Sequence, residues 1–228
     1  MRIVQIEDFF HPAAGYQINI ISKYLAKFGH KVFIVCAEMD KIPQSFKTFF
    51  GEEKIIFQDA EYCKKYHVEI CRVPARAFFS GRVIFTEEIF SRIEELHPDV
   101  VFVHNCDSYI GIRLLQKYKR GKLWCGLIMD SHMLKMASRN RLSGLFHLWY
   151  RWFCTPAIRK KHITVIRTQD DDFVQSHLGI PLKQAPWISF GSDRILFRPD
   201  EEAKVQFKIQ VVENRNAFVV VYAGKLDE

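Results

Sequence analysis

The sequence has 228 residues, enough to bury a sizeable core and to form one or two domains. Its formal net charge of +7, from 33 basic and 26 acidic residues, indicates an anionic ligand or an anionic surface. The basic residues are scattered and form no nucleic-acid-binding motif, so we expect no nucleic acid among the partners.

The cysteines and the apolar runs indicate the compartment. None of the six cysteines belongs to a C-x-x-C pair, and Cys36, Cys71 and Cys125 lie in apolar runs typical of buried strands. Met1 leads directly into an apolar strand, which indicates no signal peptide, and no apolar run reaches the roughly 18 residues of a membrane span. We therefore expect a cytoplasmic protein, and contact with the inner membrane surface stays open.

The beginning of the chain predicts a strand, a loop, a helix and a second strand. Residues 2–6 form an apolar strand, and residues 7–16 form a loop that contains one proline and one glycine. Apolar residues then recur at three and four positions over 17–28, as in a helix, and Gly29 suits a left-handed cap. Residues 31–36 are nearly continuous in apolar residues, as expected of a buried parallel strand.

The loop over residues 7–16 lies at the carboxyl end of the first strand, where open α/β sheets bind ligands. Unpaired N–H groups and the dipole of the following helix favour an anion there. Gly15 lets a phosphate approach the backbone without a Cβ in the way. Neither G-x-G-x-x-G nor a P-loop motif is present, so on this stretch alone a loop that merely turns the chain is an equal alternative.

The remaining chain continues to alternate between strands and helices. Further strands are expected at residues 55–57, 68–73, 99–104, 123–129, 163–166, 185–189 and 217–222. Further helices are expected at residues 61–66, 85–96, 109–118, 170–178 and 201–210, with a loop over residues 37–53 above the site. This alternation of strands and helices predicts an α/β protein with a doubly wound parallel sheet, in which the carboxyl ends of all strands lie at one edge.

The most apolar helical candidate spans residues 142–158 and is surrounded by arginines and lysines. An interfacial helix with aromatic and basic residues would lie on a membrane. A long packing helix would instead use its basic end to complement its dipole. We favour the packing helix and keep peripheral membrane contact as the alternative.

Several stretches resemble known enzymes. D-F-F-H-P-A-A-G at residues 8–15 and G-H-K-V at residues 29–32 resemble the opening of retaining GT-B glycosyltransferases of the large sucrose synthase-like and mannosyltransferase-like family, glycosyltransferase family 4. R-V-P at residues 72–74 and the stretch at residues 190–199 resemble further signatures of that family. Tyr16 departs from the pattern, because the family usually has a second glycine there.

The resemblance implies the N-terminal half of a GT-B fold, a Rossmann-like doubly wound sheet. Residues 1–188 would form the acceptor-binding domain, and residues 189–228 the interdomain linker and the first strand of a donor-binding domain. We expect the chain to be a fragment of a longer enzyme and to be inactive on its own.

The implied activity is transfer of a sugar from a UDP- or GDP-sugar to a glycan, a lipid-linked sugar or a small molecule, with retention of configuration. The implied setting is polysaccharide biosynthesis. Attack would come from the front face with no enzyme nucleophile. No metal or other cofactor is expected, because backbone amides and fixed cations can stabilise the leaving diphosphate.

The resemblance also implies the residues that carry the chemistry. Gly15 and Lys225 would bind the donor diphosphate, and His132, after the strand at 123–129, would contact the transferred sugar as the catalytic residue. A lone histidine is more often structural, and Lys225 is equally well explained as a solvated surface lysine.

Three further residues are expected to bind the acceptor: Tyr16, His104 and Asn105. His104 and Asn105 follow the apolar strand residues 100–103 and resemble a family region that lines the acceptor pocket. A structural cap is an equal interpretation of this pair.

Other chemistries find less support in the sequence. There is no zinc-ligand spacing and no G-x-S-x-G motif, and the three aspartates at residues 170–172 suit a helix start better than a metal. A non-catalytic nucleotide-sugar or phospho-ligand binding domain is the main alternative. Glu7 and Asp8 after the first strand also suggest a receiver-like signalling domain, but the aspartate after the third strand and the lysine after the fifth strand that it needs cannot both be placed.

Overall fold

The computed structural model describes residues 1–39, 55–79, 81–133, 141–189, 191 and 198–211. The chain divides into two compact units, residues 1–191 and residues 192–228, and each is described by itself. Within the described residues, no helix combines the length and the apolarity that a membrane span requires.

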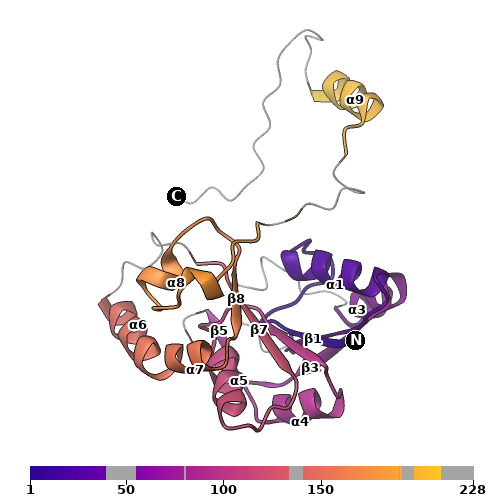
Figure 1. The fold of residues 1–228 in the computed structure, drawn as a ribbon. Coiled ribbons are helices and arrows are strands. Elements are labelled where there is room, and N and C mark those ends of the chain that lie inside the picture. Colours follow the sequence, from indigo (N-terminus) through magenta and orange to yellow (C-terminus); the bar gives the residue numbers. More distant parts are fainter. Residues whose placement is uncertain (40–54, 80, 134–140, 190, 192–197, 212–228) are drawn as a thin grey trace. The chain divides into compact units, whose positions relative to one another are not determined.

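The first unit is built on a six-stranded parallel sheet with the strand order β3-β2-β1-β6-β7-β8 (Figure 1). Its strands are β1 (Arg2–Ile6), β2 (Lys31–Ala37), β3 (Val68–Val73), β6 (Val100–Val103), β7 (Gly126–Ser131) and β8 (Thr164–Arg167). β1 is central, and Ile6 lies opposite Val35 of β2 and Val103 of β6. This is the Rossmann order 3-2-1-4-5-6, whereas receiver domains have the order 2-1-3-4-5. The Rossmann-like sheet predicted from the sequence is confirmed.

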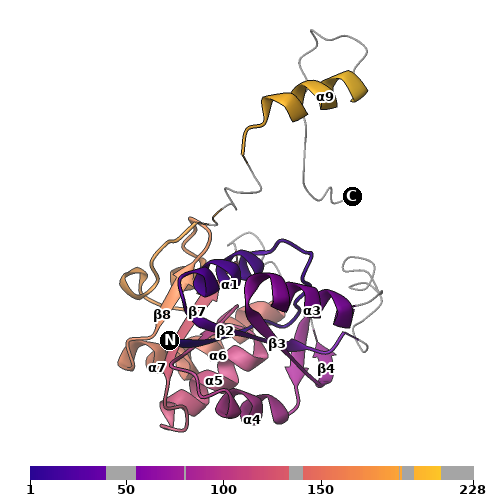
Figure 2. The same cartoon turned by 90° about the vertical axis from the view of Figure 1, so that its right-hand side faces the viewer.

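Helices cover both faces of the sheet. Figures 1 and 2 show α1 (Gln17–Lys27) and α3 (Ile55–Tyr66) on one face, and α4 (Glu88–Glu95) and α5 (Tyr109–Lys119) on the other. The strands supply apolar side chains to both faces, because alternate residues point in opposite directions. On the α1 and α3 face, Ile18, Val32, Ile34 and Tyr62 pack together. On the α4 and α5 face, the larger core includes Phe33, Val35, Ile89 and Leu114.

Three short predictions of local structure were wrong. Residues 55–57 are the start of α3 and not a strand, since residues 55, 58, 59, 62, 63 and 66 form its partly or fully buried side. Phe85 ends strand β5 (Arg82–Phe85), which pairs with β4 (Ala75–Phe79) in an antiparallel hairpin, so α4 begins only at Glu88. Residues 185–189 contribute a single bridge, from Trp187 to Arg167.

The apolar segment after β7 is two helices and not one. α6 (Arg141–Phe153) ends before Cys154, and α7 (Thr155–Lys160) carries Pro156 in its first turn. Proline has no N–H group, so it fits the first turn of a helix and interrupts a longer one. α8 (Phe173–Ser176) is shorter than the predicted helix over residues 170–178 and is followed by a single 3₁₀ turn, Leu182–Gln184.

The second unit contains α9 (Glu201–Val211), as the sequence predicts. Asp200 caps the amino end of α9, because its Oδ1 accepts the N–H of Ala203 at 2.9 Å. The predicted strand at 217–222, Lys225 and most of the predicted loop over 37–53 lie outside the described residues.

Candidate functional site

The strand order reverses between β1 and β6, the two strands at the centre of the sheet. Ligands of open α/β sheets bind outside the carboxyl ends of the strands at such a reversal. The loop over residues 7–16 follows β1, and His104 and Asn105 follow β6. The reversal therefore brings two of the predicted site segments to the same edge.

The loop after β1 is held by the first turn of α1. The Asn19 side chain accepts the N–H of Tyr16 at 3.1 Å and donates to the carbonyls of His11 and Pro12, also at 3.1 Å. Gly15 has φ +67°, which favours glycine, and no atom lies within 4 Å of the place where a Cβ would stand. The amino end of α1 thus meets a fixed loop with open space at Gly15.

Arg72 of β3 also holds the loop after β1 in place by hydrogen bonds. Its guanidinium makes two bonds to Asp59, of 2.6 and 2.8 Å, and also donates to the carbonyls of Ala37 and Phe10 at 3.0 and 3.1 Å. Burial alone would lower the pKa of Arg72, but the hydrogen bond to Asp59 holds it above its usual value. Arg72 therefore joins β2, α3 and the β1 loop, a role that the R-x-P resemblance did not suggest.

A chain of buried polar side chains crosses the strand-order reversal. Gln5 of β1 donates to the Ser22 hydroxyl of α1 at 2.6 Å and lies 3.2 Å from His104 Nε2. The other ring nitrogen of His104 lies 2.7 Å from Asp130 Oδ2. All four side chains are buried, so α1, β1, β6 and β7 are connected by hydrogen bonds inside the protein.

Asp130 connects this chain to the predicted catalytic histidine. Its Oδ1 accepts the Asn105 N–H at 2.7 Å and lies 3.2 Å from His132 Nε2. The other nitrogen of His132 lies 2.9 Å from the Thr168 hydroxyl, after β8. Burial alone would raise the pKa of Asp130, but His104 and His132 hold it well below its usual range. The carboxylate therefore stays charged and orients the half-buried His132 ring.

The backbone at Asn105 is in the left-handed region, with φ +68°, which is uncommon for a residue other than glycine. This conformation directs the Asn105 N–H to Asp130, and the next N–H, of Cys106, donates to the Asp130 carbonyl at 2.7 Å. Tyr150 of α6 supports the turn by donating to the Cys106 carbonyl at 3.1 Å. Unusual backbone of this kind is concentrated at functional sites.

Glu7, the first residue after β1, is an unusual carboxyl group. Burial raises its pKa to about 8, helped by the charges of Asp8 and Asp130 and opposed by that of His104. Burial and the charge of Glu7 in turn raise the pKa of Tyr16. Glu7 therefore interacts electrostatically with Tyr16, His104 and Asp130, and its raised pKa keeps it largely protonated near pH 7.

Asp8 lies on the hairpin side of the same edge. Burial raises its pKa to about 6, although the charge of Arg82 opposes the rise. Arg82 also pairs with Asp107 at 3.6 Å, which links β5 to the turn before α5. The edge of the sheet thus carries two carboxyl groups with raised pKa values, Glu7 and Asp8, which the sequence suggested only as part of a receiver-like domain.

One set of side chains in the described part of the chain has the composition and closeness of a metal site. The ligand atoms of His104, Asp130 and His132 lie within 4.8 Å of one another. Histidine and carboxylate ligands suit several transition metals. The same atoms here form hydrogen bonds to each other, so a metal would have to replace those bonds, and the expectation of a metal-free protein stays a prediction.

The structure brings some of the predicted site residues together at one edge of the sheet. Gly15 and Tyr16 border the β1 edge, and His104, Asn105 and His132 join it through Asp130. Lys225 lies outside the described residues. Their roles toward donor and acceptor stay predictions.

The sequence patterns assigned no part in the site to Gln5, Ser22, Asp130 and Thr168, and they suggested only a receiver-like role for Glu7. A lone amide within an apolar strand, as at Gln5, and an acidic residue directly after one, as at Asp130, were the available signals.

Comparisons with known proteins support the fold. No protein-family model matches the sequence, and no curated protein matches it. Anabaena Alr3699/HepE, solved in complex with UDP and glucose, has 12% identity and a TM-score of 0.50, over 92% of this chain and 50% of that chain. The chain therefore spans about half the length of HepE and shares its fold.

Two other solved structures were found with lower TM-scores. The glycotransferase of kitacinnamycin has 11% identity and a TM-score of 0.40, over 85% of this chain and 52% of that chain. A ugt transferase from Siraitia grosvenorii, in complex with UDP, has 8% identity and a TM-score of 0.38, over 92% of this chain and 54% of that chain.

Proposed function

We propose that the chain is the acceptor-side part of a glycosyltransferase of the GT-B type, which transfers a sugar from a UDP- or GDP-sugar with retention of configuration. The acceptor is a glycan, a lipid-linked sugar or a small molecule. The observation that carries this proposal is the buried hydrogen-bond chain from α1 to His132 across the strand-order reversal. The fold shared with HepE, which was solved with UDP and glucose, supports it.

In this proposal the donor diphosphate lies at the amino end of α1. The N–H groups of that turn and the helix dipole favour an anion. Gly15 leaves the approach open, and the Asn19 bonds hold the loop in place before the ligand arrives. Lys225 lies outside the described residues, and its role as a further donor-binding cation stays a prediction. These groups stabilise the leaving diphosphate without a metal.

His132 contacts the transferred sugar. Its ring is oriented by Asp130 on one side and Thr168 on the other, and a quarter of its side chain is exposed. A sugar hydroxyl replaces Thr168 as the partner of Nδ1, while Asp130 keeps its bond to Nε2. Asp130 is therefore a positioning residue, and His104 and Gln5 position Asp130 in turn.

The acceptor lies beside Tyr16 and Asn105. Tyr16 is 45% exposed and caps α1, so it borders both the diphosphate and the open edge. Glu7, largely protonated near pH 7, offers a hydrogen-bond donor to a hydroxyl or phosphate oxygen there.

A sugar-transfer assay tests the proposal. The complete product of the gene is incubated with radiolabelled UDP- and GDP-sugars and candidate acceptors. His132→Ala should lower kcat/KM by about 100-fold, the usual loss for one stabilising group in an active site. His30→Ala is the matched control, because His30 precedes β2 at the opposite edge of the sheet, and it should retain activity within about twofold.

Two results would contradict the proposal. Nucleotide-sugars that bind but are never turned over would favour the non-catalytic binding domain. Equal activity of the His132→Ala variant and the wild type would remove His132 from the reaction.

A further inference from the structure

Helix α6 carries a stripe of large apolar side chains that are exposed in the described part of the first unit. Six large apolar side chains are exposed by 38% to 71%: Leu142, Leu145, Leu148, Trp149, Trp152 and Phe153. At 3.6 residues per turn, they fall within an arc of about 140° on one side of the helix. We call these six residues the α6 stripe.

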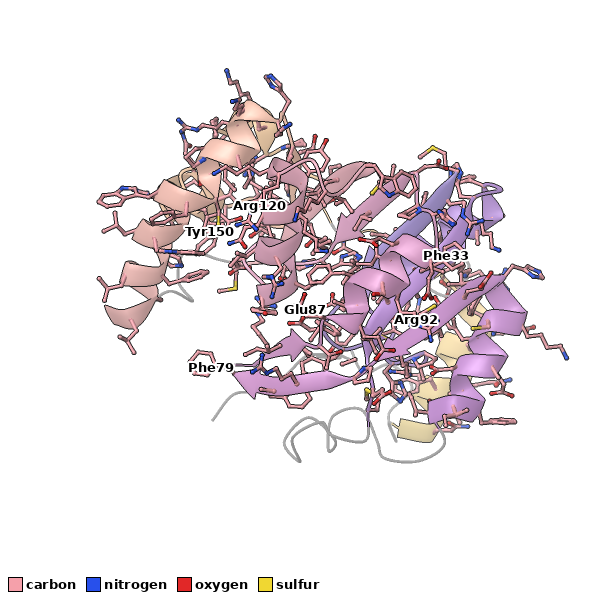
Figure 3. All side chains as sticks on the ribbon, turned by 90° about the horizontal axis from the view of Figure 1, so that it is seen from below. Phe33, Phe79, Glu87, Arg92, Arg120 and Tyr150 are labelled. Carbon is pink, nitrogen blue, oxygen red and sulfur yellow. The ribbon has the colours of Figure 1, made fainter. Side chains whose placement is uncertain are left out.

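The opposite side of α6 is docked on the protein. Tyr150 is fully buried and bonds to the Cys106 carbonyl, and His147 is buried with its ring 5.5 Å from Phe173 and 5.1 Å from His177. In Figure 3, Tyr150 lies on the side of α6 toward α5, and other side chains of α6 point away from the sheet. Packing therefore explains one side of α6 and leaves the α6 stripe unexplained.

The sequence around α6 has a one-sided charge. Between Asp130 and Asp170 there are eight lysines and arginines and no aspartate or glutamate. Arg151 and Arg159 donate to carbonyls of the segment after α8. Lys160, the last residue of α7, and Lys161 directly after it are exposed.

Helix α5 adds to this positive surface. Lys161 lies 6.0 Å from the ring of Tyr118, which places the end of α7 beside the end of α5. Lys119, the last residue of α5, and Arg120, which follows it, are both exposed. The basic residues of two helices therefore gather near one end of the α6–α7 pair.

We propose that α6 and α7 form a membrane-surface helix pair that binds anionic lipid. Aromatic and leucine side chains suit the boundary between headgroups and acyl chains, and lysines and arginines bind anionic headgroups. A second copy of this chain is a less favourable partner for the α6 stripe, because two such basic surfaces would repel each other. This inference is independent of the proposed sugar transfer.

Vesicle flotation of the full chain tests the apolar part of the proposal. The vesicles contain phosphatidylcholine alone or phosphatidylcholine with about a third phosphatidylglycerol. The wild type should float with the anionic vesicles, and Leu145→Ser with Trp152→Ser should reduce that binding at least about tenfold. Trp124→Ser is the matched control, since Trp124 is 62% exposed outside α6, and it should bind as the wild type does.

A charge-reversal pair tests the electrostatic part. Lys160→Glu with Lys161→Glu should weaken binding to anionic vesicles by at least about tenfold, and added salt should do the same to the wild type. Lys64→Glu with Lys65→Glu, on the exposed side of α3, makes the same change of charge away from α6 and should have little effect.

Three outcomes would overturn the proposal. The first is no flotation of the wild type with anionic vesicles. The second is equal loss of binding in both charge-reversal pairs, which would indicate attraction by net charge alone. The third is a dimeric wild type that becomes monomeric in the Leu145→Ser, Trp152→Ser variant without a change in lipid binding, which would assign the α6 stripe to a second copy.

Discussion

Replacing Glu7 with glutamine should make the protein more stable at alkaline pH and leave it nearly unchanged at acidic pH. Glutamine has the shape of a protonated glutamate, and its carbonyl oxygen can still accept the N–H of Asp8, now 3.0 Å from Glu7 Oε1. The substitution therefore removes the ability to ionise and keeps the local hydrogen bond.

The magnitude follows from the two pKa values of Glu7. Its pKa is about 8 in the folded protein and 4.5 without the fold, so between these values the unfolded state binds fewer protons. The wild type thus loses stability as the pH rises through this window, and the loss is complete above about pH 8. A pKa difference of about 3.5 corresponds to about 5 kcal/mol. Part of the Glu7 side chain reaches solvent, so this is an upper limit, and we expect about 2 to 5 kcal/mol.

Urea denaturation at about pH 4 and about pH 9 measures this difference between Glu7→Gln and the wild type. The free energies of unfolding should agree within about 0.5 kcal/mol at the lower pH and diverge at the higher pH. Glu61→Gln, on the exposed side of α3, should change stability by no more than about 0.5 kcal/mol at either pH. A Glu7→Gln effect of the same size at both pH values would refute the buried, protonated state of Glu7.

Three further substitutions test the structure around the site. Asp130→Asn should lower the free energy of unfolding by about 3 kcal/mol at neutral pH. The difference in unfolding free energy between this variant and the wild type should shrink as the pH falls below about 4, because the depressed pKa of Asp130 stabilises the fold only while the carboxylate is charged. In Gly15→Ala the new Cβ would meet no atom within 4 Å, but the alanine must adopt φ +67°. Thermal unfolding should therefore show a loss of about 1 kcal/mol in the free energy of unfolding. Arg72→Ala should cost about 3 kcal/mol in urea denaturation because it leaves Asp59 without its partner, and Arg72→Lys should recover only part, since an ammonium cannot make both bonds.

The sheet could be predicted because its strands are short segments that consist mostly of apolar residues. Residues 2–6, 68–73 and 109–118 were placed to within a residue, since a buried strand and an amphipathic helix each leave a local pattern. The start of α3 was missed because Ile55, Ile56 and Phe57 are three consecutive apolar residues, which is a pattern typical of a strand. Their place in a helix is evident only from the spacing of the buried positions further along α3.

The site was harder to predict because its connections are long-range. Gln5 and His104 are 99 residues apart in sequence, and no local pattern relates them. His132 was noticed for its position after a strand, whereas the residue that orients it, Asp130, was not assigned a role. The exposure of the α6 stripe also depends on which side of the helix docks, and the apolar pattern of residues 142–158 does not reveal that side.

A crystal structure of the complete gene product with a UDP-sugar would show whether the donor diphosphate binds at the amino end of α1. We expect diphosphate oxygens within hydrogen-bond distance of the N–H groups at residues 15–18, with the sugar next to His132. A diphosphate bound away from the amino end of α1, with the His104–Asp130–His132 network untouched by the ligand, would contradict this expectation.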